Sequence, residues 1–330
     1  MAVKDLQKDH FYDLPGPDDQ ELLDNIDGRL HGPMNGFVKR YFGNLLDIAD
    51  GSSAAPSPKD FLRWFSSYVS REVDGARGIW HIASEDTSNN TRLLLGVPSV
   101  GASEGQARWD DIQVIGQFYE SASVCYHKGL LRLCQSAYQV FASQPTRLFL
   151  HGFYIRGSMV EFWVFDRSGT YCSSVLDLQT DYTQFLSIIV SYQRMPDQDL
   201  GQLNLTHTDE GGSYINAGEK KLYLESRPIA SRERLVGTGT ACYRARRPGS
   251  DQWDYVLKFK WRWARDRPED ELLKLAKQKS VWGAISVDHY EDSNRKYGES
   301  APWLPVGDTQ KIRQKPFHSR RCKYRTQART

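Results

Sequence analysis

Apolar residues recur with the period of an α-helix in five stretches of the chain. One stretch opens at Asp18 with acidic residues, which the positive end of a helix dipole favours. The other four are residues 36–48, 58–73, 128–143 and 181–192. The stretches before residue 80 are expected to pack against a core without taking part in chemistry.

Strand-like runs lie between these predicted helices. They are residues 92–97, 109–118, 147–155, 159–166 and 171–178, with turns at Gly157 and at Arg167, Ser168 and Gly169. The order is helices, two strands, a helix, a three-stranded meander and a helix. This order predicts an α+β domain, and a second α+β unit begins with the strand-like run 220–229.

A glycine pair in the second unit predicts a loop that approaches phosphate. Gly237, Gly239 and Thr240 lie between two strand-like runs, and the apolar strand that follows carries Lys258. Glycines let backbone N–H groups reach phosphate oxygens, and a lysine brings a positive charge to the same oxygens. A plain hairpin with a solvated lysine is the alternative.

An amphipathic helix with an acidic start follows Lys258. A carboxylate at this place holds such a lysine in position. Glu271 is the predicted partner, and Glu269 is the alternative.

Composition adds few constraints. The 330 residues have a net charge of +2, which by itself predicts no strong preference for any class of partner. The five cysteines contain no Cys-x-x-Cys pair, so neither a zinc site nor a disulfide framework is expected. No run approaches the ~20 apolar residues that span a bilayer, and the first residues lack the apolar core of a signal peptide. We therefore expect an intracellular protein, cytoplasmic or nuclear, with no membrane contact.

Several short stretches of the sequence match the motifs of one protein family, in the same order along the chain. They are residues 109–116, 144–153, 163–169, 236–240, 256–258 and 271–276. In these stretches the chain resembles the fungal-type protein kinase family. The resemblance implies a Ser/Thr kinase that uses ATP and magnesium. It also implies an α+β fold, in which a PD-(D/E)xK nuclease-like α/β/α core precedes a kinase small-lobe-like antiparallel sheet with one helix.

The patterns and the resemblance together predict four segments. They are an N-terminal helical segment 1–80, a nuclease-like family domain 81–215, a kinase small-lobe-like segment 216–292 and a basic, disordered tail 293–330. In the nuclease-like part, Gln117 stands where a metal-binding carboxylate is needed and Tyr119 where a lysine is needed. A scaffold without a metal site is therefore expected there.

The kinase part also departs from the family. Cys242 replaces the third loop glycine, and neither a His-Arg-Asp-like nor an Asp-Phe-Gly-like motif follows Tyr290. We therefore assign no catalytic residue, leave the enzyme question open, and expect a truncated or pseudokinase-like member with a partial, weak ATP site and no magnesium site.

Two rival functions remain open. One is a nucleic-acid-binding or degenerate nuclease-like protein that uses the basic tail. The other is a scaffold for an unknown protein partner, which would cover the apolar face that normally meets a kinase large lobe.

Overall fold

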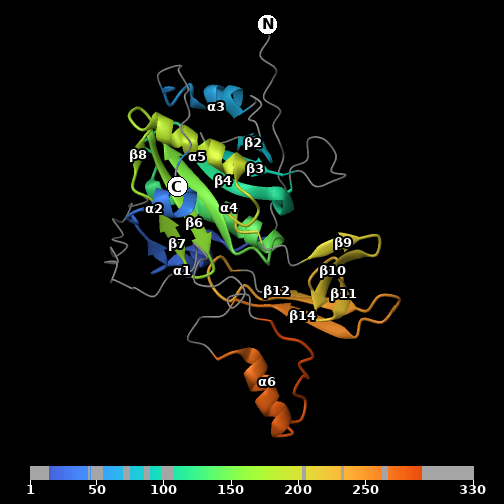
Figure 1. The fold of residues 1–330 in the computed structure, drawn as a ribbon. Coiled ribbons are helices and arrows are strands. Elements are labelled where there is room, and N and C mark those ends of the chain that lie inside the picture. The colour runs from blue at the N-terminus through green and yellow to red at the C-terminus, as the bar shows by residue number, and fades with distance from the viewer. Residues whose placement is uncertain are drawn as a thin grey trace, which may run out of the picture.

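The structure is a computed structural model that describes residues 15–43, 45, 55–69, 75–84, 90–97, 108–202, 206–231, 234–261 and 267–291. This part of the chain contains two separate β-sheets, and helices pack on both faces of the larger one, which is the α+β architecture that the sequence predicts. Figure 1 shows the larger sheet wrapped by helices and the smaller one beside it. The expected basic tail lies outside the described residues.

The first sheet is mixed and has eight strands among the described residues. Its order is β1 (Leu30–His31), β7 (Thr170–Cys172), β6 (Met159–Asp166), β5 (Phe149–Arg156), β4 (Ile112–Tyr119), β3 (Asn90–Gly96) and β2 (Ile79–Ser84), and β8 (Leu176–Asp177) pairs with β6. Strand β4 runs parallel to β5, and the helix between them crosses over one face of the sheet. Every residue of β4 is buried, as expected for a strand with helices on both faces.

Two hydrophobic clusters fill the two faces of this sheet. One face packs against α1 (Asp19–Ile26) and α4 (Tyr126–Ser143). The other packs against α2 (Phe37–Phe42), α3 (Phe61–Val69) and α5 (Tyr182–Arg194). The five predicted helices are observed, but the one expected over 36–48 ends at Phe42, and residues 46–48 and 70–73 lie outside the described residues. The strand expected over 109–118 begins at Ile112, because Trp109–Asp111 forms a short 3-10 turn.

The predicted strand 171–178 is interrupted. It forms β7 and β8, because the Ser173 hydroxyl accepts the backbone N–H of Phe162 at 3.0 Å. A side chain thereby takes the place of a strand-to-strand bond. The predicted turn at residues 167–169 is confirmed, since the Asp166 carboxylate accepts the backbone N–H groups of Ser168 and Gly169 at 2.7 and 2.9 Å.

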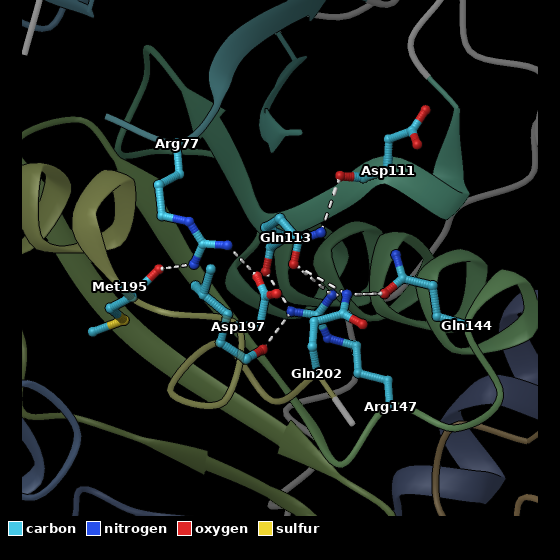
Figure 2. A network of polar contacts seen from close by, with 9 residues as sticks. Arg77, Asp111, Gln113, Gln144, Arg147, Met195, Asp197 and Gln202 are labelled. Carbon is cyan, nitrogen blue, oxygen red and sulfur yellow. Dashed lines mark hydrogen bonds and ion pairs between the residues drawn. The ribbon is translucent and has the colours of Figure 1, made fainter. Parts of the chain in front are cut away.

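A buried polar network closes the first sheet where β4 begins (Figure 2). Arg147 is fully buried, and its guanidinium donates to the backbone oxygens of Phe149, Ile112, Gln113 and Leu200. The side-chain oxygen of Gln144 accepts a further bond at 2.8 Å. This one side chain therefore joins the start of β4, the end of α4 and the loop after α5.

The second sheet is antiparallel. It contains β9 (His207–Asp209), β10 (Gly212–Ala217), β11 (Lys220–Leu224), β12 (Ala230–Ser231), β13 (Ala241–Arg246) and β14 (Tyr255–Phe259), and α6 (Glu269–Gln278) follows. The sequence placed the start of this unit at residue 216, within β10. The sheet itself starts at His207, because the β9–β10 hairpin continues its ladder to β11.

Candidate functional site

The glycine bend joins two paired strands of the second sheet. β12 and β13 are antiparallel neighbours, with Ala230 opposite Cys242. Between them Gly237 has φ 138° and Gly239 has φ 44°. Side chains other than glycine rarely adopt such angles, so the backbone itself requires glycine at both places.

Lys258 lies on β14, next to the strand that leaves the bend, and pairs with Cys242 across the ladder. Its Nζ is 2.5 Å from Glu269 Oε1, and Lys260 Nζ is 3.2 Å from Glu269 Oε2. The hydrogen bond from Lys258 is the main reason that the pKa of Glu269 lies below its usual value. The Lys258 side chain is 40% exposed, so the pair is accessible and contributes little to stability.

Of the two carboxylates that the sequence offered, Glu269 is the one at the lysine. Glu271 lies elsewhere, with its Oε2 3.3 Å from Arg267 Nε. Two residues along a helix turn a side chain by about 200°. The first residue of α6 therefore faces β14, and Glu271 faces away from it.

The bend contacts the part of the chain up to Gln202 that forms the first sheet and its helices, which is called the first domain below. Leu235 and Val236 are 0% and 4% exposed and belong to the hydrophobic cluster of α1 and α4. The Asn25 side chain on α1 donates to the Val236 carbonyl at 2.9 Å and accepts the Val236 N–H at 2.8 Å. The Gly237 N–H donates to the Arg167 carbonyl at 2.9 Å.

Arg167 is the second anchor of the bend. Its guanidinium donates to the carbonyls of Arg234 and Phe141 and lies 4.3 Å from the centre of the Phe141 ring. Burial lowers the pKa of Arg167 to about 10. Asn25 and Arg167 were not among the predicted site residues. The local sequence predicts only a turn at Arg167, and no local pattern distinguishes Asn25.

A small pocket lies between this anchor and the bend. Arg167, Arg234, Gly239 and Thr240 are among the residues that line it. Its volume of about 10 Å³ is roughly the space of one water molecule. A nucleotide does not fit into this pocket.

The place on β4 where the resemblance implies a metal-binding carboxylate is closed as well. Gln117 is fully buried, and its amide donates to the Asn90 side chain and to the Thr91 carbonyl. Tyr119 is 4% exposed and lies edge-on to Tyr154, with ring centres 6.1 Å apart. Nowhere in the described ranges do three or more His, Cys, Asp or Glu side chains gather as metal ligands. No helix in those ranges is long and apolar enough to cross a membrane.

Comparison with known proteins identifies the family. The family model for fungal protein kinase matches residues 96–302, which is more than half of the chain and includes the bend, Lys258 and α6. No curated protein and no solved structure matches. The chain therefore belongs to the fungal protein kinase family.

Proposed function

We propose that residues 1–330 of this kinase-like chain contact the phosphates of ATP weakly through Lys258 and do not by themselves transfer a phosphoryl group. The observation that carries the proposal is the ion pair between Lys258 on β14 and Glu269 on α6, one strand away from the glycine bend. In protein kinases a strand lysine held by a helix carboxylate places its charge on the α- and β-phosphates.

The residues of this chain support binding more than turnover. Lys258 and Lys260 supply positive charge, and Glu269 orients them. Phosphoryl transfer also needs a base for the attacking hydroxyl and an Asp and Asn for magnesium. The 330 residues contain neither a His-Arg-Asp nor an Asp-Phe-Gly triplet that would supply them. We therefore propose a pseudokinase role for these residues.

Isothermal titration with ATP tests the proposal. Lys258→Ala is expected to weaken binding by roughly tenfold or more, about 1.4 kcal/mol. Lys260→Ala removes the same charge from the same carboxylate and is expected to change binding much less. Equal affinities for wild type and Lys258→Ala would rule out the phosphate contact.

We further infer that the first domain has the nuclease-like scaffold and ends near Gln202. The order α3, β2, β3, β4, α4, β5, with β4 parallel to β5, supports that scaffold. The closed surroundings of Gln117 and Tyr119 favour a packing role for it. Magnesium-dependent DNA cleavage by the full chain would contradict this part of the proposal.

A protein-interaction scaffold is the second candidate, because the region around α6 exposes apolar side chains. Trp282 is 97% exposed, Ile285 76% and Leu272 47%. Such a surface suits a protein partner with an apolar contact face. The test is a partner that binds wild type and Lys258→Ala alike but not a Trp282→Ser, Ile285→Ser double variant. A partner that also binds the double variant would exclude this surface as its site.

A further inference from the structure

The glycine bend has its hydrogen-bonding groups engaged by another part of the molecule. Asn25 on α1 satisfies both the N–H and the carbonyl of Val236, and the Arg167 carbonyl accepts the N–H of Gly237. These contacts span much of the chain, since Asn25 and Val236 are 211 residues apart. They come from two different elements of the first domain, α1 and the turn after β6.

Packing reinforces these hydrogen bonds. The Leu235 side chain is fully buried in the cluster formed by α1, α4 and the first sheet. Gly239 lies directly against the Arg167 guanidinium, because a Cβ on Gly239 would be only 2.7 Å from Arg167 Nε. The bend is therefore held on the first domain on both sides of Gly237.

A phosphate needs the same backbone groups. Loops that cradle phosphates do so with free N–H groups that point at the anion. In the docked bend the N–H groups of Val236 and Gly237 already donate to oxygens of the first domain. An N–H that donates to Asn25 or Arg167 cannot at the same time donate in full to a phosphate oxygen.

We infer that the first domain is an autoinhibitory latch on the nucleotide site: Asn25 and Arg167 hold the glycine bend in a form that excludes phosphate. This inference rests on the proposed ATP contact and specifies how it is regulated. Undocking the bend frees the two N–H groups, and ATP then binds at Lys258 with the bend closed over its phosphates. By linkage, ATP loosens the first domain's hold on the bend to the same extent that docking weakens ATP binding.

Substitution of Asn25 is expected to release the bend without disturbing the rest of α1. Its side chain is only half-buried and lies on a helix that is anchored separately by Leu22 and Ile26. Asn25→Ala removes both hydrogen bonds to Val236 and leaves these anchors intact. Gln20→Ala on the exposed face of the same helix is the matched control, because Gln20 bonds only to Asp24 in its own helix.

The experiment combines ATP titration with amide hydrogen exchange at Val236 and Gly237. For Asn25→Ala we expect roughly tenfold tighter ATP binding and roughly tenfold faster exchange of both amides. Gln20→Ala is expected to match wild type in both. Asn25→Asp keeps the hydrogen-bond acceptor and loses the donor. Its ATP affinity and exchange rates are expected to lie between those of wild type and Asn25→Ala, and it replaces Asn25→Ala if that variant does not fold.

The outcomes separate the latch from the site it regulates. Equal ATP affinity in wild type and Asn25→Ala, with faster exchange in the variant, would overturn the latch while leaving the ATP contact in place. Unchanged exchange in both Asn25 variants would overturn the latch as well. Absence of ATP binding in every variant would overturn the proposed function and the latch with it.

Discussion

Arg147 and His151 are titratable side chains that the first sheet buries almost completely, at 0% and 1% exposure. Arg147 is surrounded by backbone carbonyls, and burial lowers its pKa to about 9. His151 donates one hydrogen bond to the Asp199 carbonyl at 3.0 Å, and aromatic rings such as those of Phe149 and Tyr192 surround it. The two residues therefore respond differently to substitution and to pH.

Arg147→Lys is expected to destabilise the protein by about 3 kcal/mol or more, because an ammonium has three donors and cannot replace a five-donor guanidinium. The carbonyls of the network would lose their partners. Arg77→Lys is the matched control, since its ion pair with Asp197 is about 40% exposed on each side and should cost less than about 1 kcal/mol. Urea unfolding measures both. Similar losses for the two variants would contradict the role given to Arg147, the buried arginine of the network in Figure 2.

His151 makes the fold sensitive to acid. Burial lowers its pKa to about 4, whereas an unfolded histidine has a pKa near 6.5. Between these values the unfolded chain binds a proton that the folded one does not, so stability falls as pH falls. From about pH 8 to about pH 5 the loss is about 2 kcal/mol.

The measurement is the free energy of unfolding at the two pH values. His151→Gln keeps a donor for the Asp199 carbonyl and does not titrate. It should therefore lose about 2 kcal/mol less than wild type over this range. An identical pH dependence in the two proteins would show that His151 is not the group responsible.

At the scale of elements, α6 is held by charge more than by apolar packing. Its first turn carries Glu269, Asp270 and Glu271, which suits the positive end of the helix dipole. Asp270 also pairs with Lys274 at 2.9 Å, one turn along the helix. Leu272 stays 47% exposed. The position of α6 relative to β14 therefore depends on the contact of Glu269 with Lys258 on that strand and with Lys260 just after it.

Glu269→Gln and Glu271→Gln separate the two predicted partners of Lys258. Each removes one negative charge from the same turn of α6. We expect Glu269→Gln to weaken ATP binding by roughly fivefold, about 1 kcal/mol, because Lys258 loses its orienting partner. Glu271→Gln is expected to leave affinity unchanged, since Glu271 pairs with Arg267. A loss only in Glu271→Gln would reverse the assignment.

At the scale of the whole molecule, the glycine bend is a part of the second unit that enters the core of the first. Leu235 is fully buried among side chains of α1 and α4, although it belongs to the connection between β12 and β13. The second sheet has only a small core of its own, around Ile215, Leu222 and Ala245. We therefore expect the two sheets to unfold together.

Leu235→Ala is expected to cost about 3 kcal/mol and to split the single unfolding transition into two, because it removes apolar contacts that join the sheets. Leu272→Ala on α6, where the side chain is 47% exposed, should change stability by less than about 1 kcal/mol. Calorimetry of both variants provides the comparison. A single transition at an unchanged temperature for Leu235→Ala would contradict this coupling.

Local patterns were enough to predict the amphipathic helices and the order of most strands. The predicted helix 128–143 is observed as Tyr126–Ser143, since its apolar spacing leaves little ambiguity. The same patterns missed β2, where exposed Ile79 and buried Trp80 form a short run at the edge of the sheet. They also missed where the ladder of the second sheet begins, because hairpin pairing depends on strands farther along the chain.

The sequence predicts which residue types form the candidate site and in what order they occur. It does not predict which of these residues contact one another. Gly237, Gly239 and Lys258 follow a recognisable order along the chain. The choice between Glu269 and Glu271 depends on how the start of α6 is rotated toward β14, which the sequence does not specify. The contact between Asn25 and Val236 joins distant segments through two ordinary hydrogen bonds, and it leaves no local signature.

Labelling with an acyl-phosphate derivative of ATP tests the central claim most directly. A lysine amine near the bound phosphates attacks the acyl carbon, the carbon–oxygen bond to the phosphate breaks, and ATP leaves while the acyl group stays on the lysine as an amide. Lys258 and Lys260 are 40% and 39% exposed, so exposure alone would label them equally. Mass spectrometry should find Lys258 labelled preferentially, with excess ATP suppressing that labelling. Equal labelling of the two lysines, unchanged by ATP, would contradict a nucleotide site at this ion pair.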